Sequence, residues 1–71
     1  MFAVSMIGKY KMSFSKHTTL TEAKEHANEQ LKNGADYLHG RFDYAEIYDQ
    51  TSKERIRKDG IGSEWRKVDE Q

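Results

Sequence analysis

One stretch of this sequence limits the fold more than any other: TLTEAKEHANEQLKNG, residues 19–34, has the pattern of a single amphipathic helix. Thr19 and Glu22 have the spacing of a capping box, and Gly34 supplies a stop signal after the last apolar position. The apolar positions recur at helical period and form a narrow, alanine-rich stripe: Leu20, Ala23, Ala27 and Leu31. We therefore predict a helix over roughly residues 20–33 that lies close against a sheet.

The residues before this helix have the period of a half-buried strand. Between Phe2 and Phe14 the even positions are apolar or glycine, whereas lysine and serine hold odd positions from Lys9 onward. A three-residue hairpin loop at IGK would give the pairs Met6 with Tyr10, Val4 with Met12 and Phe2 with Phe14. This register predicts that Phe14 lies in the core.

Two alternatives to this hairpin remain open. One is a single long strand bent at Gly8. The other is a two-residue GK turn, which fits less well because it changes the parity and places Met12 and Phe14 beside Ala3 and Ser5.

After the helix, the segments FDYAEIYD and ERIRK are predicted to be two strands joined by the turn DQTS, and DGIG ends the second strand. The connector ADYLHGRFD precedes them, and we expect Tyr37 and Leu38 to cover the edge of the core. In the tail SEWRKVDEQ, Trp65 and Val68 are compatible with a short strand or a helical turn, and the last residues are expected to fray.

The element order is β-β-α-β-β, which predicts one small α+β domain over residues 1–71: an antiparallel sheet of about four strands with one helix packed on one face. This order resembles that of the small uncharacterised proteins encoded by bacteriophages and mobile elements, and the resemblance rests on TLTEAKEHA and AEIYD. It implies an origin of that kind. It implies no activity, and no functional residue carries over.

Composition narrows the setting and the classes of partner. The chain has no cysteine, which excludes disulfides and thiolate metal sites and favours a reducing, cytoplasmic location. Twelve basic and twelve acidic residues give no net charge to steer the chain toward nucleic acid or membrane. The opening MFAVSMI is too short for a membrane span.

No residue pattern indicates catalysis, a metal site or a cofactor. His17, His26 and His39 are scattered over a loop, the helix and the connector, without ligand spacing. Ser13 and Ser15 have no histidine beside them in a nucleophile motif, and so small a core leaves little cleft in which to desolvate a carboxylate. We therefore expect a protein that is not an enzyme and holds no cofactor.

The second hairpin contains the first candidate binding residues. If Ala45, Ile47 and Ile56 face the helix, the other face carries Tyr44, Glu46, Tyr48, Lys53, Arg55 and Arg57, with Lys9 and Lys11 beside them. Aromatic and basic side chains on an exposed sheet suit nucleic-acid binding. They are also routine cross-strand pairs on a solvated face, and the opposite parity would bury the tyrosines.

Protein binding is the leading expectation. A sheet with a helix on one side leaves its other face and both edges uncovered, where a partner subunit or a target protein, of a host for instance, could bind. Trp65 and Arg66 are residue types enriched in such contacts, although Trp65 also fits a core position. The alternative function is a nucleic-acid-binding module that uses Tyr44, Tyr48, Arg55 and Arg57.

Overall fold

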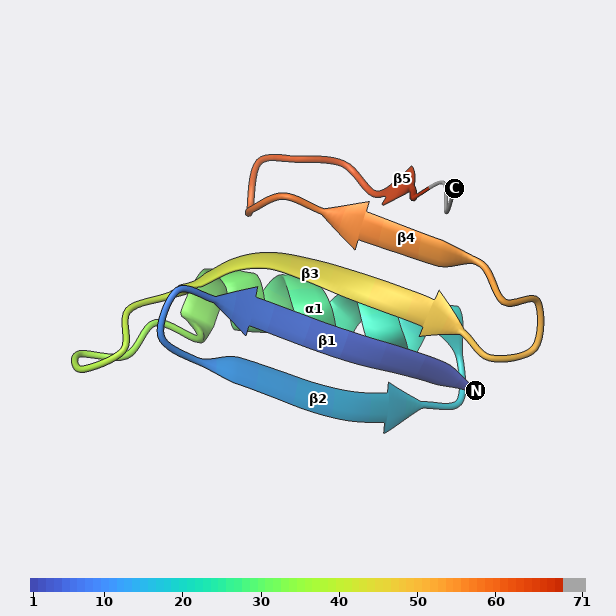
Figure 1. Ribbon diagram of the computed structural model, residues 1–71, viewed down its shortest axis with the longest axis horizontal. Helices are drawn as coiled ribbons and strands as arrows, with labels where there is room; N and C mark the ends of the chain where they lie inside the picture. Colours follow the sequence, from blue (N-terminus) through green and yellow to red (C-terminus); the bar gives the residue numbers. More distant parts are fainter. Residues whose placement is uncertain (69–71) are drawn as a thin grey trace.

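The helix separates two strands from three along the chain, and a single sheet brings all five together. The computed structural model describes residues 1–68. In chain order it contains β1 (Phe2–Gly8), β2 (Met12–His17), α1 (Leu20–Asn33), β3 (Phe42–Asp49), β4 (Arg55–Lys58) and β5 (Arg66–Lys67) (Figure 1). All five strands join one antiparallel sheet in the order β2-β1-β3-β4-β5.

The α+β class is confirmed, with five strands where about four were expected. The additional strand, β5, is only two residues long, too short for alternating polarity to reveal it. The fraying expected of the last residues concerns 69–71, which lie outside the described residues.

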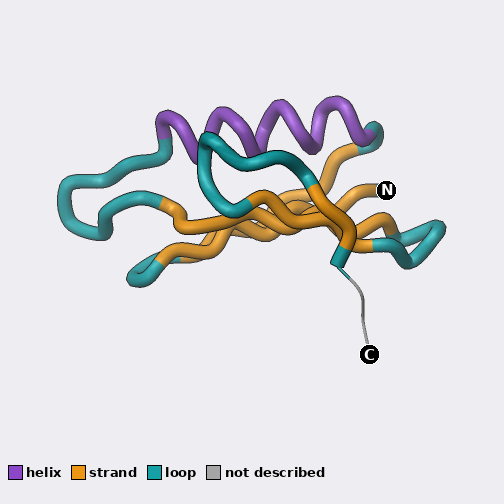
Figure 2. The backbone as a smooth tube through the Cα atoms, turned by 90° about the horizontal axis from the view of Figure 1, so that it is seen from above, coloured by secondary structure: helices purple, strands orange, loops and turns teal. Residues whose placement is uncertain are grey.

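The sheet is covered on one side. Helix α1 lies over β1 and β3, and no helix within residues 1–68 lies on the opposite side, which we call the open face (Figure 2). No helix in the described part of the chain is long and apolar enough to cross a membrane.

Local capping sets both ends of α1, as predicted. The Thr19 hydroxyl accepts a hydrogen bond from the Glu22 N–H at 3.1 Å, and the Gly34 N–H donates to the Gln30 carbonyl at 2.8 Å. A side chain at Gly34 would collide with that carbonyl and lie 3.0 Å from the Phe42 ring, so glycine is needed there for the close approach of the chain. Ala23, Ala27 and Leu31 are buried as expected, but Leu20 stays 37% exposed in the first turn.

The core is one layer between α1 and the sheet. Val4 and Met6 of β1 and Ala45 and Ile47 of β3 lie beneath the helix, joined by Phe42. Of the two parities left open for the second hairpin, the structure has the one in which Ala45 and Ile47 face the helix. The alanine-rich stripe of α1 lies close to the sheet, and the smaller Ala45 and Ile47 occupy the positions beneath it, with Tyr44 and Tyr48 on the other face.

The predicted register of the first hairpin is wrong. Ile7, not Val4, lies opposite Met12, and Phe14 lies opposite Ser5. The chain turns at Lys9 and Tyr10, and the Gly8 N–H donates to the Lys11 carbonyl at 2.8 Å. This turn gives the parity of the less favoured GK alternative, although it lies one residue further along the chain.

The register puts Phe14 on the open face, 63% exposed, and leaves Met12 75% exposed and Tyr10 67% exposed. The prediction of a buried Phe14 fails for a geometric reason. The two-residue turn at Lys9 and Tyr10 places Phe14 on the side of β2 that faces away from α1, and the helix side of this edge strand carries Ser13 and Ser15 instead.

The connector between α1 and β3 also differs from expectation. Tyr37 and Leu38 do not cover the core: they are 101% and 78% exposed. Asp36 and Gly40 exchange two backbone hydrogen bonds of 2.8 Å and close the loop on itself, so it projects beyond the sheet (Figure 1).

The connection from β4 to β5 rises toward the helix side of the sheet (Figure 2). Trp65, in this connection, is half-buried and packs against the core cluster. The Val68 N–H donates to the Arg55 carbonyl at 2.9 Å and holds the end of β5 to β4.

Candidate interaction surfaces

The strand register determines which side chains share the open face. Residues directly opposite each other in neighbouring strands point to the same side. From β2 to β5 the open face therefore carries Met12, Phe14 and Lys16, then Ala3, Ser5 and Ile7, then Tyr44, Glu46 and Tyr48, then Arg55 and Arg57, and finally Arg66. This surface is apolar along β2 and basic along β4 and β5.

On the basic half, guanidinium groups cover the tyrosine rings. The Cζ atom of Arg57 lies 3.8 Å from the centroid of the Tyr44 ring, and that of Arg55 lies 5.6 Å from the centroid of Tyr48. Glu46 stands between the two arginines, with a carboxylate oxygen 3.9 Å from each guanidinium. The rings and the cations therefore contact each other.

Asp59 ties two of these arginines together. Its carboxylate accepts hydrogen bonds from Arg57 Nε at 2.6 Å and from Arg66 Nη2 at 2.8 Å. The hydrogen bond from Arg57 has the larger effect and that from Arg66 the smaller, and both hold the pKa of Asp59 below its ordinary value. The bond to Asp59 raises the pKa of Arg57. The positive charge on this half is therefore partly neutralised within the protein.

The structure brings together five of the seven predicted binding residues: Tyr44, Tyr48, Arg55, Arg57 and Arg66. Lys53 instead lies in the β3–β4 turn with a positive φ of 63°, where Asp49 accepts bonds from the Thr51 N–H and the Ser52 hydroxyl, both at 2.9 Å. Trp65 lies on the helix side of the sheet, against the core.

Neither Lys9 nor Lys11 joins the basic half, contrary to expectation. Lys11 donates to the Gly34 carbonyl, and its Nζ lies 4.5 Å from the centroid of the Phe42 ring, so it reaches the C-terminal end of α1. Lys9 lies in the turn, with its Nζ 5.4 Å from the centroid of the Tyr10 ring.

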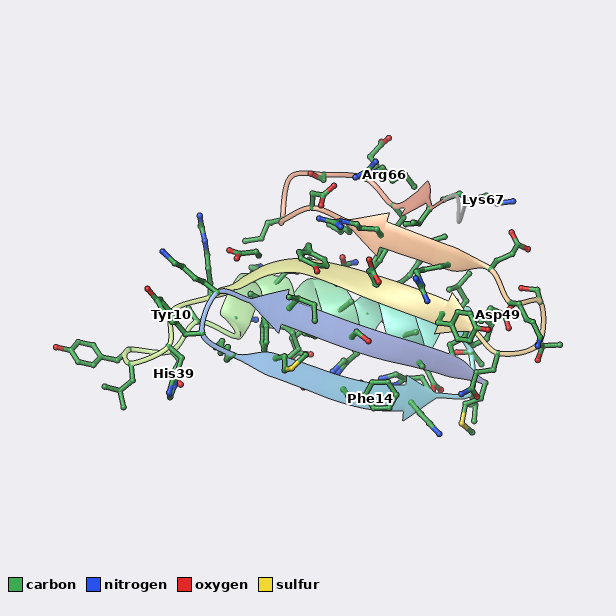
Figure 3. The ribbon with its side chains drawn as sticks, viewed as in Figure 1. Tyr10, Phe14, His39, Asp49, Arg66 and Lys67 are labelled. Carbon is green, nitrogen blue, oxygen red and sulfur yellow. The ribbon has the colours of Figure 1, made fainter. Side chains whose placement is uncertain are left out.

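The sequence did not predict the apolar half of the open face, which Met12 and Phe14 form. Met12 and Phe14 are exposed on β2, and Figure 3 shows the Phe14 ring over this strand on the side away from α1. The parity of the GK turn contained the signal, because it moves both residues off the core face.

The outer edge of β2 offers backbone hydrogen-bonding groups. Hydrogen-bonded pairs alternate along an antiparallel ladder, and the Gly8 to Lys11 bond fixes the phase. Ser13, Ser15 and His17 therefore bond to β1, whereas Met12, Phe14 and Lys16 direct their N–H and C=O groups outward. The strand contains no proline or glycine, and its ladder with β1 has no bulge.

A second exposed apolar site lies on the 36–40 loop. The Asp36 carboxylate accepts a hydrogen bond from the Leu38 N–H at 2.8 Å and lies 3.1 Å from His39 Nδ1. The bond with His39, and then that with Leu38, lower the pKa of Asp36. Figure 3 shows His39 beneath this loop, at the end of the molecule. These bonds constrain the loop backbone, and the loop presents Tyr37 and Leu38 to solvent.

Two histidines that are distant in sequence meet between β2 and α1. The ring centroids of His17 and His26 are 4.8 Å apart, and Ser15 Oγ lies 3.0 Å from His17 Nε2. His26 Nε2 is buried without a hydrogen-bond partner among the described residues, and burial, then the neighbouring His17, lower the pKa of His26. No group of three metal-ligating side chains occurs within residues 1–68.

A surface hollow of about 350 Å³ lies between the end of α1 and the loop after β4. Its polar lining includes Arg41, Asp43 and Asp59, and Asp59 is already bonded to arginines. A smaller, more apolar hollow of about 220 Å³ lies beside Phe2, Leu20 and Ile56.

Comparisons of the chain with protein-family models, with curated proteins and with solved structures gave no significant match. Its surfaces are therefore interpreted from their own geometry.

Proposed function

We propose that this chain is a non-enzymatic binding protein that engages a protein partner through β2 and the adjoining apolar half of the open face. The observation that supports this proposal is the coincidence of two features on one strand. Met12 and Phe14 are largely exposed, and the same residues direct outward N–H and C=O groups that have no strand partner within residues 1–68.

An extended segment of a partner could add to the sheet as a further strand. The backbone groups of β2 would supply the hydrogen bonds, and the side chains of Met12 and Phe14 would select apolar residues on the added strand. Natural proteins protect long edge strands with proline, bulges or several charges, and β2 has only Lys16 and His17 at one end. The absence of such protection along most of β2 supports a role in binding.

Nucleic-acid binding is the second candidate, and the bases that share the open face favour it: Lys16, Arg55, Arg57 and Arg66. Two features of the open face weigh against nucleic-acid binding. Glu46 and Asp59 lie among these bases, and the guanidinium groups occupy ring faces on which nucleobases would stack. We rank it below protein binding.

The proposed setting is the cytoplasm, as a bacteriophage or mobile-element accessory protein. It rests on the lack of cysteine and on the resemblance of TLTEAKEHA and AEIYD.

The test is capture of partners from a bacterial lysate, with and without nuclease, by the wild-type chain and two variants. Phe14→Lys changes the proposed surface. Tyr10→Lys is the matched control, because Tyr10 is an equally exposed aromatic residue in the turn outside β2. A protein captured by wild type and by Tyr10→Lys, lost with Phe14→Lys and insensitive to nuclease is the expected result. Loss of every captured species on nuclease treatment would place nucleic acid first.

Binding through the edge has a direct signature. Hydrogen exchange at the Met12, Phe14 and Lys16 amides should slow when the partner binds, because these N–H groups become paired. Unchanged exchange at all three would exclude strand addition at β2.

A further inference from the structure

We infer that the strand that pairs with β2 is β2 of a second copy, in a twofold dimer with Phe14 on the axis. This inference rests on the proposed function, because it names the partner of the same edge. An antiparallel pair is what a twofold axis perpendicular to the sheet generates, so the two five-stranded sheets would become one continuous sheet with both helices on one side.

The alternation of side chains restricts the possible registers. Met12, Phe14 and Lys16 point to the open face, and Ser13, Ser15 and His17 point to the helix side. Opposed residues share a face, so an antiparallel pair of two β2 strands with both open faces on one side must match even positions with even positions. The twofold axis must then lie midway between the two copies of one β2 residue, so that this residue is opposite itself.

The outward backbone groups decide between the remaining registers. With Phe14 on the axis, Phe14 pairs with Phe14 and Met12 pairs with Lys16 of the second copy, so every outward N–H and C=O of the strand is matched. With Ser15 on the axis, Phe14 pairs with Lys16, and Met12 meets Thr18, which lies past the end of β2. A shift in the other direction pairs Lys16 with Tyr10, which lies in the turn.

The side chains agree with the Phe14 register. The two exposed Phe14 rings become cross-strand neighbours, and aromatic pairs of this kind stabilise a sheet. Lys16 lies opposite Met12 at each end, so the two lysines are kept apart. The chain has no net charge, so two copies do not repel each other over a distance.

Cysteine cross-linking tests the register in a chain that has no cysteine of its own. In the proposed dimer Ser13 lies opposite Ser15 of the second copy, as a non-hydrogen-bonded pair with Cα atoms about 4.5 Å apart, which a disulfide can span. A mixture of Ser13→Cys and Ser15→Cys chains should form a disulfide-linked heterodimer under mild oxidation, whereas neither variant alone should cross-link efficiently. Efficient cross-linking of Ser15→Cys alone would overturn the Phe14 register.

Sedimentation equilibrium tests the dimer itself. The wild-type chain should dimerise in the micromolar range, since pairing of one strand is a small interface. Phe14→Pro should be monomeric and folded, because the N–H that it removes points away from β1 and edge positions tolerate proline. Circular dichroism verifies that the variant is folded. Phe14→Lys keeps the N–H but places two positive charges side by side at the axis, so it should also be monomeric.

A wild-type monomer at about 100 µM would refute the dimer. The proposed function would survive that result if the β2 amides were still protected by a heterologous partner. It would fail as well if no partner protected them.

Discussion

The guanidinium of Arg57 lies over the ring of Tyr44, with its Cζ atom 3.8 Å from the ring centroid, and its Nε is bonded to Asp59 at 2.6 Å. One side chain thus covers an aromatic face and satisfies a carboxylate. Both contacts would have to be given up, or shared, before Arg57 could hold a phosphate and Tyr44 could stack on a base.

This arrangement predicts weak binding of oligonucleotides. A short single strand of DNA should bind with a Kd of about 1 µM or weaker at ~150 mM salt, as expected of a non-specific basic patch. Fluorescence anisotropy over a salt series measures it. A submicromolar Kd, with the salt slope reduced by about one unit in Arg55→Ala or Arg57→Ala and stacking lost in Tyr48→Ala, would reverse the ranking of the two candidate functions.

Truncation to alanine should reduce stability much more at Leu31, in the core, than at Phe14, on the surface. Leu31 is 3% exposed, and Leu31→Ala should lower the free energy of unfolding by about 2–5 kcal/mol. Phe14→Ala should change it by about 0.5 kcal/mol or less, because the ring is on the surface. Urea denaturation at low protein concentration, where a dimer does not contribute, gives both values. Equal losses for the two variants would mean that Phe14 is buried.

The N-cap of α1 provides a local test. Thr19→Ala should reduce stability by about 1 kcal/mol, because the Glu22 N–H loses its acceptor. Thr18→Ala is the control: its hydroxyl is 3.3 Å from the Glu22 carboxylate on the exposed surface and caps no backbone group. The same thermal midpoint for Thr19→Ala and wild type would place the start of the helix elsewhere.

His26 predicts a dependence of stability on pH. Its pKa is lowered from the ordinary value of 6.5 by burial and then by His17, so the unfolded chain takes up a proton at a higher pH than the folded chain does. The stability contributed by neutral His26 is complete above pH 6.5 and decreases as the pH falls toward the pKa of the folded state. Asp36, Asp49 and Asp59, whose pKa values are lowered from 3.8, act in a separate window: their contribution is present above pH 3.8 and is lost below it.

Denaturation at pH 5 and pH 7.5 measures the effect of His26. Wild type should be less stable at pH 5, and His26→Gln should remove much of that difference. His39→Gln, on the exposed loop, should leave it in place. A pH dependence that is unchanged in His26→Gln would show that another group is responsible.

The features that could be predicted from the sequence are those that adjacent residues determine. Thr19, Glu22 and Gly34 define the helix within one turn at each end, and alternation identifies β3 and β4 without tertiary information. The sequence left the buried face of the second hairpin open between Ala45 with Ile47 and Tyr44 with Tyr48, because apolar or aromatic side chains stand on both faces.

The features that could not be predicted depend on one residue of loop length or on tertiary position. Shortening the first turn from three residues to two transfers Phe14 and Met12 from the core face to the open face, and apolar character alone does not reveal the change. Tyr37 and Leu38 look like core residues in sequence, but bonds of Asp36 hold them in a loop that projects beyond the sheet. The meeting of His17 and His26 depends on how α1 crosses the sheet, which their spacing does not encode.

Trp65 is the single tryptophan of the chain, and it packs between the β4–β5 connection and the core on the helix side of the sheet. Its fluorescence is therefore a built-in optical reporter of whether the C-terminal segment is docked. Because β2 lies at the opposite edge of the sheet, the fluorescence of Trp65 should not change when another strand binds to β2. A single chromophore can thus distinguish loosening of the fold from events at the binding edge.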